Sequence, residues 1–209
     1  NVALNLRALC APTTLFAVIG KDAEGKELSA LLNKEGINTN YIHESDTRVT
    51  TNKVRIMGRN QQMMRLDHEQ TDDISKVEEL ALLKAFFQYV DTEKPSLVIL
   101  EDYNKGVLTE HVITSVIAYC KERGIPTAVD PKKKNFLVYK DCTIFKPNLK
   151  EVKEGLNLLI DEVNHAALQS IHQQLNQKLK HEVSLITLSE KGVFYQSSVH
   201  SNIIPTHIR

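Results

Sequence analysis

The sequence predicts an α/β protein with a mostly parallel central sheet, helices on both of its faces, and a small separate β-sheet lid. Three observations support this prediction. Strand-like and helix-like segments alternate along most of the 209 residues. Several strand-like segments, such as 13–20 and 96–101, are continuously apolar, which is typical of strands buried on both faces. The segments between 38 and 69 instead alternate polar and apolar residues, as a one-sided sheet does.

Apolar periodicity assigns the elements of the α/β part in chain order. The predicted helices cover 2–9, 22–36, 75–90, 109–122 and about 161–180. The predicted strands cover 13–20, 96–101, 125–130, 142–148 and the two segments that flank the Ser-Glu-Lys-Gly turn at 189–192. Leu28, Leu31 and Leu32 share one face of the helix at 22–36, so we expect that face to be apolar.

The lid is predicted from strands near 38–43, 49–58 and 61–69. The last two are separated only by Arg59-Asn60, which indicates a hairpin. Period-2 alternation puts Val54, Ile56, Met64 and Leu66 on one face and Lys53, Arg55, Arg65 and Asp67 on the other. We therefore divide the chain into a core at 1–37 and 70–209 and a lid at 38–69.

Composition limits the kinds of binding partner and the cellular compartment that we expect for this protein. Lys and Arg together number 26, as do Asp and Glu, so the formal net charge is zero and we expect no nucleic-acid partner. The apolar runs are shorter than the roughly 18 residues of a membrane span, so we expect no membrane partner. Three widely separated cysteines favour a reducing, cytoplasmic location.

Polar side chains follow four of the predicted strands. Ligands of open parallel sheets bind beyond the carboxyl ends of the strands. Hydroxyl, carboxylate, amide and ammonium groups collected at one edge suit phosphates and Mg²⁺. The residues concerned are Glu101, Asp102, Lys105, Asp130, Asn148, Glu151, Thr187 and Ser189.

Each of these residues also has an explanation that needs no ligand. Asp102 and Asp130 suit turns, and Lys105 suits a solvated surface. Asn148 and Glu151 have the spacing of a helix capping box. The cations Lys53, Arg55 and Arg65 could form the solvent face of the hairpin. The hypothesis of a site therefore depends on the residues lying together.

Six segments together resemble the ribokinase-like (PfkB-type) carbohydrate kinases. They occur in the family's order and are spread along most of the chain. Two of them depart from the family pattern, because Glu101 and Ser189 replace the usual Ser and Gly. The segments are NVALNL (1–6), AVIGKDAEGKEL (17–28), EDYNKGVL (101–108), AVDPK (128–132), KPNLKE (146–151) and TLSEKGV (187–193).

Within that family, residues 50–69 resemble the kinase module of the bifunctional heptose kinase/adenylyltransferases, which carries Lys-x-Arg followed by Arg-Asn-Gln-Gln-x-x-Arg-x-Asp. This resemblance implies ATP-dependent phosphorylation of D-glycero-D-manno-heptose 7-phosphate at its anomeric hydroxyl, a step toward lipopolysaccharide-core precursors. A substrate that already carries a phosphate needs extra cations, which Lys53, Arg55 and Arg65 could supply.

The resemblance also implies roles for individual residues. Lys105 would act in catalysis close to the transferring phosphoryl group. The implied sugar-binding residues are Asn1, Lys53, Arg55, Arg65, Asp102 and Lys105; the implied nucleotide-binding residues are Asn148, Glu151, Thr187, Ser189 and Gly192. Glu151 would hold Mg²⁺ through water, and Asp130 is a second metal candidate.

The family's catalytic base is the Asp of a Gly-Ala-Gly-Asp motif, which these 209 residues lack. The family's opening Gly-Gly is missing as well. We therefore expect the sequence to be part of a longer protein and to be inactive alone, because loss of a base typically lowers the rate about 10²–10⁴-fold.

Three alternatives remain open at this point. The protein could be another ribokinase-like sugar kinase. It could be a non-catalytic module that binds a nucleotide or sugar phosphate without turnover. A dinucleotide-dependent oxidoreductase is disfavoured, because no Gly-x-Gly-x-x-Gly follows a strand. We also expect a homodimer formed through the lid, because exposed edge strands need a cover.

Overall fold

The computed structural model describes residues 1–159 and 162–206. They form two compact units. Unit 1 contains residues 1–89 and 105–107, and unit 2 contains residues 90–104 and those from 108 onward. The short segment 105–107 thus belongs to unit 1, although its neighbours in the chain belong to unit 2.

Unit 1 is built around two parallel strands, β1 (Thr14–Gly20) and β2 (Asn38–Ser45), joined by α2 (Ala23–Lys34). Phe16 stacks on Tyr41 with ring centroids 4.7 Å apart. Tyr89 donates a hydrogen bond of 3.0 Å to Thr14 Oγ1, which ties α3 (Lys76–Glu93) to β1. The remaining helix, α1 (Val2–Ala8), precedes β1.

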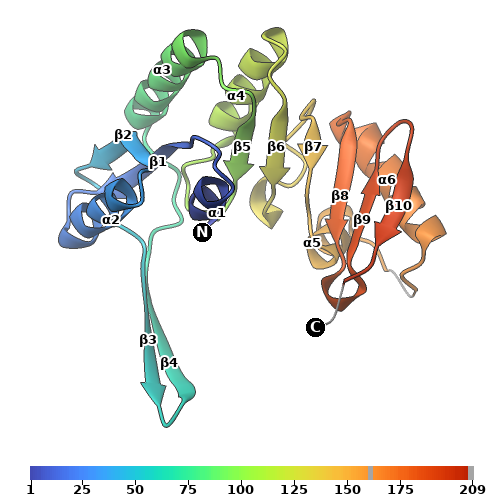
Figure 1. Ribbon diagram of the computed structural model, residues 1–209, viewed down its shortest axis with the longest axis horizontal. Coiled ribbons are helices and arrows are strands. Elements are labelled where there is room, and N and C mark those ends of the chain that lie inside the picture. The colour runs from blue at the N-terminus through green and yellow to red at the C-terminus, as the bar shows by residue number, and fades with distance from the viewer. Residues whose placement is uncertain (160–161, 207–209) are drawn as a thin grey trace. The chain divides into compact units, whose positions relative to one another are not determined.

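The hairpin of unit 1 consists of β3 (Asn52–Gly58) and β4 (Gln61–His68). Val54 lies opposite Leu66 and Lys53 lies opposite Asp67, so the predicted separation into apolar and charged faces is confirmed. Arg59 and Asn60 at the turn both have positive φ, as a two-residue hairpin turn requires. The ribbon projects from the rest of its unit (Figure 1), and every residue of β4 is exposed.

Unit 2 contains a six-stranded sheet in the order β10-β9-β8-β7-β6-β5. The four strands from β5 to β8 are parallel, and β9 and β10 extend the sheet in antiparallel fashion (Figure 1). The bounds are β5 Val98–Glu101, β6 Thr127–Asp130, β7 Ile144–Phe145, β8 Val183–Thr187, β9 Val193–Gln196 and β10 Ser201–Ile204.

Helices supply the other half of the unit 2 core. In α4 (Glu110–Glu122), Val112, Val116 and Cys120 are buried, as their spacing predicts. Thr109 caps this helix by accepting a hydrogen bond of 3.2 Å from Val112 N. In α6 (His165–Leu179), a stripe containing Leu168, Leu175 and Leu179 is buried, and the helix packs along β9 and β10.

The predicted α/β class with a mostly parallel sheet is confirmed, and several details differ. The strand predicted at 142–148 shrinks to β7, because Pro147 cannot donate to a strand ladder. The chain then enters α5 (Leu149–Leu156). Helix α6 begins at His165, and the start predicted at 161 lies outside the described residues. Strand β10 was not predicted.

Two predictions about unit 1 need correction or remain open. Strand β2 pairs with β1, so the segment 38–45 is not part of a sheet with the hairpin. The division into a core at 1–37 and 70–209 and a lid at 38–69 otherwise stays a prediction. Residues 207–209 of that core lie outside the described residues. The apolar face of α2 is not buried within unit 1, since Leu31 is 55% exposed.

Among the described residues, no helix is both long enough and apolar enough to span a bilayer.

Candidate functional site

The carboxyl ends of the parallel strands in unit 2 hold a connected set of polar side chains. Strands β5 and β6 are paired so that Glu101 lies beside Asp130. The backbone N–H of Asp102 donates to the Asp130 carbonyl over 3.0 Å. Asn148 forms an isolated parallel bridge with Thr187, whose N–H donates to the Pro147 carbonyl. Parallel pairing thus gathers residues from four separate segments at one edge.

Asp102 is fixed in place by three neighbours. Its side chain is only 4% exposed. Tyr139 Oη donates to Oδ2 over 2.7 Å, Asn135 Nδ2 donates to the same oxygen over 3.3 Å, and Asn104 N donates to Oδ1 over 2.7 Å. Burial and the adjacent Asp102 raise the pKa of the Tyr139 hydroxyl, so it stays a donor. Asp102 is therefore a turn residue, as one interpretation predicts, and a preorganised carboxylate as well.

The charges beside Asp102 are partly compensated. Lys146 Nζ lies 2.7 Å from Asp130 Oδ2. Burial and the negative charge of Asp130 together raise the pKa of Glu101. An ammonium ligand, a metal or an added proton would all relieve this crowding of carboxylates. Two adjacent carboxylates, of which Asp130 is paired with Lys146, make this edge a suitable place for a cation.

Asn148 and Glu151 form a complete capping box at the start of α5. Asn148 Oδ1 accepts from Glu151 N, and Glu151 Oε2 accepts from Asn148 N, each over 2.8 Å. The other carboxylate oxygen of Glu151 forms an ion pair with Lys132. The capping-box explanation, which needs no ligand, is thus correct for the hydrogen bonds between Asn148 and Glu151. The box also fixes both side chains at the sheet edge.

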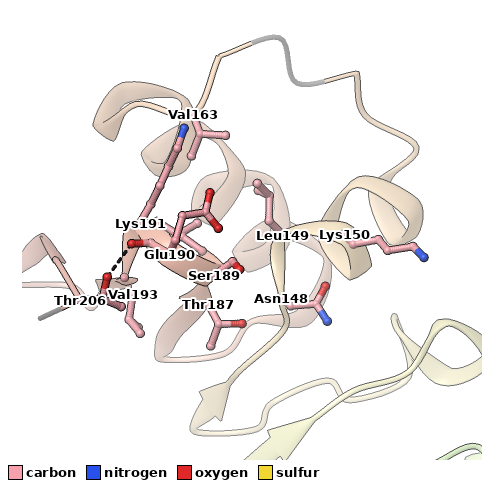
Figure 2. A pocket seen from close by; sticks show the side chains of 12 residues that line it. Asn148, Leu149, Lys150, Val163, Thr187, Ser189, Glu190, Lys191, Val193 and Thr206 are labelled. Atoms are coloured by element: carbon pink, nitrogen blue, oxygen red, sulfur yellow. Dashed lines mark hydrogen bonds between the residues drawn. The ribbon is translucent and has the colours of Figure 1, made fainter. Parts of the chain in front are cut away.

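A pocket of about 750 Å³ opens beside this helix start. Figure 2 shows Thr187 close to Ser189 in the lining, with Asn148 and Lys150 to their right and Glu190, Lys191 and Thr206 to their left. The turn is held by Thr206, whose hydroxyl donates to the Glu190 carbonyl over 2.5 Å. The lining residues are Asn148, Leu149, Lys150, Val163, Thr187, Leu188, Ser189, Glu190, Lys191, Gly192, Val193 and Thr206.

Gly192 has a backbone reason to be glycine at this pocket. Its φ is +102°. A Cβ atom there would lie 1.9 Å from the Ile204 carbonyl oxygen. A side chain at this position would therefore force the turn away from β10, and the pocket would change shape.

The carboxylates suit a metal held through water better than one held directly. Within residues 1–159 and 162–206, no group of three or more His, Cys, Asp or Glu side chains could enclose a metal ion. Both oxygens of Glu151 already have partners, and Asp130 shares its charge with Lys146. A hydrated Mg²⁺ needs nearby negative charge rather than a closed cage. Asp130 and Glu151 supply that charge.

Unit 1 carries the other predicted residues. Asn1 is exposed and precedes α1, without a side-chain capping bond. Lys53 and Arg65 both contact Asp67, at 2.9 and 2.7 Å. Arg55 lies directly opposite Arg65 in the hairpin register. The location of these residues on the charged hairpin face agrees with both the solvent-face and the phosphate-binding interpretations.

Lys105 lies in unit 1, at the base of the hairpin. Its ammonium group forms an ion pair of 2.6 Å with Glu69, and its side chain is 25% exposed. It is therefore not the freely solvated lysine that one interpretation of the sequence allows. The structure brings Asp102, Asp130, Asn148, Glu151 and Thr187 together within unit 2, whereas Lys105 and the hairpin cations form a separate cluster within unit 1.

Several residues that shape these clusters were not predicted. Asn135 and Tyr139 hold Asp102, but they lie in and just after a 3₁₀ helix of only three residues, Lys133–Asn135, which is too short to show a periodic pattern. Lys146 was not singled out, because the sequence shows it only as a polar residue next to Pro147. Glu69 follows β4 and was not singled out, although its position two residues after Asp67 extends the same alternation.

Comparison with known proteins gives a consistent result. A family model described as pfkB family carbohydrate kinase matches residues 1–208. Bifunctional protein HldE of Methylobacillus flagellatus is 39% identical over 193 residues, which is 92% of this chain and 39% of that protein. Bifunctional protein HldE of Coxiella burnetii is 37% identical over 195 residues, 92% of this chain and 38% of that protein. The chain thus spans about two fifths of the length of these curated relatives.

Solved structures share the fold. The structure of phosphofructokinase-2 from Escherichia coli in complex with potassium has a TM-score of 0.76 at 16% identity, covering 98% of this chain and 64% of that chain. The structure of Arabidopsis thaliana ribokinase complexed with ribose and ATP has a TM-score of 0.72 at 16% identity, covering 99% and 64%. At these identities the likeness concerns the fold alone.

Proposed function

Since the chain belongs to the pfkB family of carbohydrate kinases, we propose that it is the kinase module of a heptose phosphate kinase. In this proposal the protein transfers the γ-phosphoryl group of ATP to the anomeric hydroxyl of D-glycero-D-manno-heptose 7-phosphate. The product is the 1,7-bisphosphate, a precursor for the lipopolysaccharide core. The relatives named bifunctional protein HldE and the resemblance of residues 50–69 to heptose kinase modules support this substrate.

The observation that carries the proposal is the pocket of unit 2. Four residues assigned to the nucleotide from the sequence line this one pocket: Asn148, Thr187, Ser189 and Gly192. Its volume of about 750 Å³ is within the range of small-molecule sites. Glu151, the fifth, is hydrogen-bonded to Asn148 at its rim. Lys150 and Lys191 add positive charge to the lining.

The proposed chemistry is positioning and charge neutralisation. Thr187, Ser189 and the backbone of Gly192 would bind nucleotide phosphates, and Asp102 would orient the sugar. Lys105 would offset charge that develops on the transferring group. When bound, Mg²⁺ would neutralise phosphate oxygens, and Glu151 and Asp130 would hold it through water. Phosphoryl transfer needs little covalent chemistry from the protein, so fixed geometry at this edge is the main requirement.

The substrate's own phosphate would bind to the hairpin. Arg55 and Arg65 lie opposite each other, and like charges in that arrangement repel. A phosphate would relieve the repulsion, since guanidinium groups bind its oxygens in a bidentate manner. An unphosphorylated sugar offers no such relief. The hairpin therefore favours a sugar phosphate.

The hairpin also supports the proposed homodimer. Its apolar face is uncovered, with Val54 48%, Ile56 43% and Leu66 52% exposed. Apolar faces on a two-stranded ribbon are rarely left in water, because an isolated hairpin is at best marginally stable. A second copy of the same face would cover it. The three cysteines are unpaired, which fits the proposed cytoplasmic location.

An ADP-release assay on the natural full-length protein tests the proposal. D-glycero-D-manno-heptose 7-phosphate is compared with ribose, fructose 6-phosphate and adenosine at equal concentrations. We expect the highest kcat/KM with the heptose phosphate. Equal activity on all four substrates would indicate another sugar kinase, and ATP binding without turnover on any of them would indicate a binding module.

A further inference from the structure

We propose that Glu69 is a positioning residue that holds Lys105 at the base of the hairpin and couples it to the hairpin's cations. This inference rests on the proposed function, because it assumes that Lys105 acts on the transferring phosphoryl group. Glu69 immediately follows β4 and contacts two lysines at once. Its Oε1 lies 2.6 Å from Lys105 Nζ, and its Oε2 lies 2.7 Å from Lys53 Nζ.

These contacts belong to a longer line of alternating charges. Lys53 also contacts Asp67 at 2.9 Å, and Asp67 contacts Arg65 at 2.7 Å. We call this line the charge ladder; its members in order are Arg65, Asp67, Lys53, Glu69 and Lys105. Glu69 is thus the only member that joins Lys105 to the rest of the ladder among the described contacts.

The ladder is more sheltered near Lys105 than at its outer end. The exposed fraction of the side chain is 48% at Arg65 at the outer end, but only 23% at Glu69 and 25% at Lys105, with Asp67 at 26% and Lys53 at 34% between them. Lys105 and Lys53 lower the pKa of Glu69, so it stays ionised near neutral pH. Networks of partly sheltered charges hold side chains more firmly than single surface pairs do.

The backbone of Lys105 is held by the same unit. Arg48 donates to the Lys105 carbonyl over 2.7 Å and to the Asp72 carbonyl over 2.9 Å. Ile74 N donates to the Gly106 carbonyl over 2.9 Å. Gly106 has a φ of +77°, and a Cβ there would lie 1.8 Å from the Asp72 carbonyl oxygen. The backbone of this segment is therefore tightly fitted.

The contacts above fix the backbone of Lys105, and Glu69 constrains its side chain. A lysine has a long flexible stem and a point charge, so a fixed backbone alone does not fix its ammonium group. Glu69 supplies that constraint. Its contacts would also change when the hairpin binds a phosphate. A phosphate that draws Arg65 away from Asp67 would strengthen the Asp67–Lys53 contact and loosen Lys53 from Glu69. Glu69 would then form an ion pair with Lys105 alone.

The test compares Glu69→Gln with wild type in the natural full-length protein. The glutamine keeps the shape and loses the charge. We expect kcat for the best sugar phosphate to fall about 10- to 100-fold, with the KM for ATP changed less than twofold, because misplacing one group by about 1 Å can lower a rate to this degree. We also expect an amine-reactive ester to acylate Lys105 several-fold faster than in wild type.

The matched control is Asp46→Asn. It breaks the Lys21–Asp46 ion pair, which is also in unit 1 but far more exposed. This variant should keep kcat within twofold and leave the acylation of Lys105 unchanged. If Glu69→Gln does not fold by circular dichroism, Glu69→Asp replaces it, because the shorter side chain cannot reach both lysines, and the same two changes are expected.

Two results would overturn the inference. One is a kcat within twofold of wild type in a folded Glu69 variant. The other is an unchanged acylation rate at Lys105. If wild type phosphorylates no sugar at all, the proposed function fails, and the acylation comparison still decides whether Glu69 holds Lys105.

Discussion

The β3–β4 hairpin and the β5–β8 sheet bury their side chains to very different extents. In unit 2, Leu100, Val129 and Phe145 are each at most 5% exposed. In the hairpin, Ile56 and Met64 are 43% and 53% exposed although they form a continuous apolar face. The hairpin keeps the separation into apolar and charged faces that its sequence predicts. The difference is that α4 and α6 supply apolar stripes to the sheet, whereas no helix of unit 1 supplies one to the hairpin.

The buried sheet and the exposed hairpin therefore have different roles, because the first stabilises its unit and the second is the part that we assign to recognition. The core of unit 2 holds the pocket residues in fixed positions, since rigid elements make precise sites. The hairpin stabilises its unit little and carries the charged and apolar faces that we assign to substrate and to a second copy.

A matched pair of isoleucines measures the contrast in burial directly. Ile113→Ala removes a side chain with no exposed surface and should lower the free energy of unfolding by about 2–5 kcal/mol. Ile56→Ala should lower it by less than about 1 kcal/mol, because Ile56 is partly exposed already, and should weaken the proposed dimer. Urea denaturation followed by circular dichroism gives the first value, and sedimentation gives the second. Equal losses of stability would contradict the contrast.

A buried histidine pair makes unit 2 sensitive to acid. His181 Nε2 lies 2.6 Å from Ser184 Oγ, and His172 Nδ1 lies 2.9 Å from the same oxygen. Burial and the neighbouring His172 lower the pKa of His181 to about 4. The unfolded chain, with a pKa near 6.5, binds this proton first as pH falls. Stability is therefore full above about pH 6.5 and declines toward pH 4, by about 3 kcal/mol in total.

Thermal unfolding between pH 4 and 7.5 measures this decline. We expect His181→Gln to flatten the pH dependence and His68→Gln, on the exposed hairpin, to leave it as in wild type. A pH dependence that persists in His181→Gln but disappears in His68→Gln would show that the hairpin, not the core, responds to acid.

Arg65→Ala tests recognition at the hairpin without disturbing the core. A charged hydrogen bond to phosphate contributes about 1.5–3 kcal/mol, so the proposed preference for the heptose phosphate over ribose should fall about 10- to 100-fold. The free energy of unfolding should change by less than about 0.5 kcal/mol. Arg59→Asn at the hairpin turn, which keeps a residue that tolerates positive φ, serves as the control. The phosphate-binding role is wrong if both variants keep the preference.

Asn148 serves as a helix cap and, in our proposal, as a nucleotide ligand. Asn148→Ala should lower stability by about 1 kcal/mol through loss of the cap and should also weaken ATP binding. Asn164 caps α6 in the same way, accepting from Ala167 N over 2.9 Å. Asn164→Ala should therefore match the loss of stability and leave ATP affinity unchanged. Calorimetric titration with ATP separates the two roles, and equal affinities in both variants would leave Asn148 a cap only.

Much of the fold could be predicted because apolar spacing is local information. The four-residue spacing of Val112, Val116 and Cys120 was enough to define α4 and its buried face. The alternation in the hairpin was enough to define its register. The pairing of β2 with β1 was not predictable in this way, because it depends on which distant strand supplies the partner. The exposed face of α2 shows the same limit, since periodicity gives a face but not what covers it.

Candidate site residues could be singled out only at strand ends. Asp130 and Thr187 are the last residues of β6 and β8, Asn148 lies three residues after β7, and parallel pairing brings them to one edge. Tyr139 and Lys146 were missed, because a hydrogen bond to Asp102 or an ion pair with Asp130 depends on geometry between segments. Glu69 was missed for the same reason, since its partner Lys105 is 36 positions further along the chain.

Hydrogen exchange with bound ligands tests the central claim most directly. ADP and D-glycero-D-manno-heptose 7-phosphate are added separately to the full-length protein, and exchange is read by mass spectrometry. We predict that ADP slows exchange at 187–193 and 148–151 and leaves 53–67 unchanged, whereas the sugar phosphate slows exchange at 53–67. Protection by ADP elsewhere, with none at 187–193, would contradict the assignment of the pocket to the nucleotide of a sugar kinase.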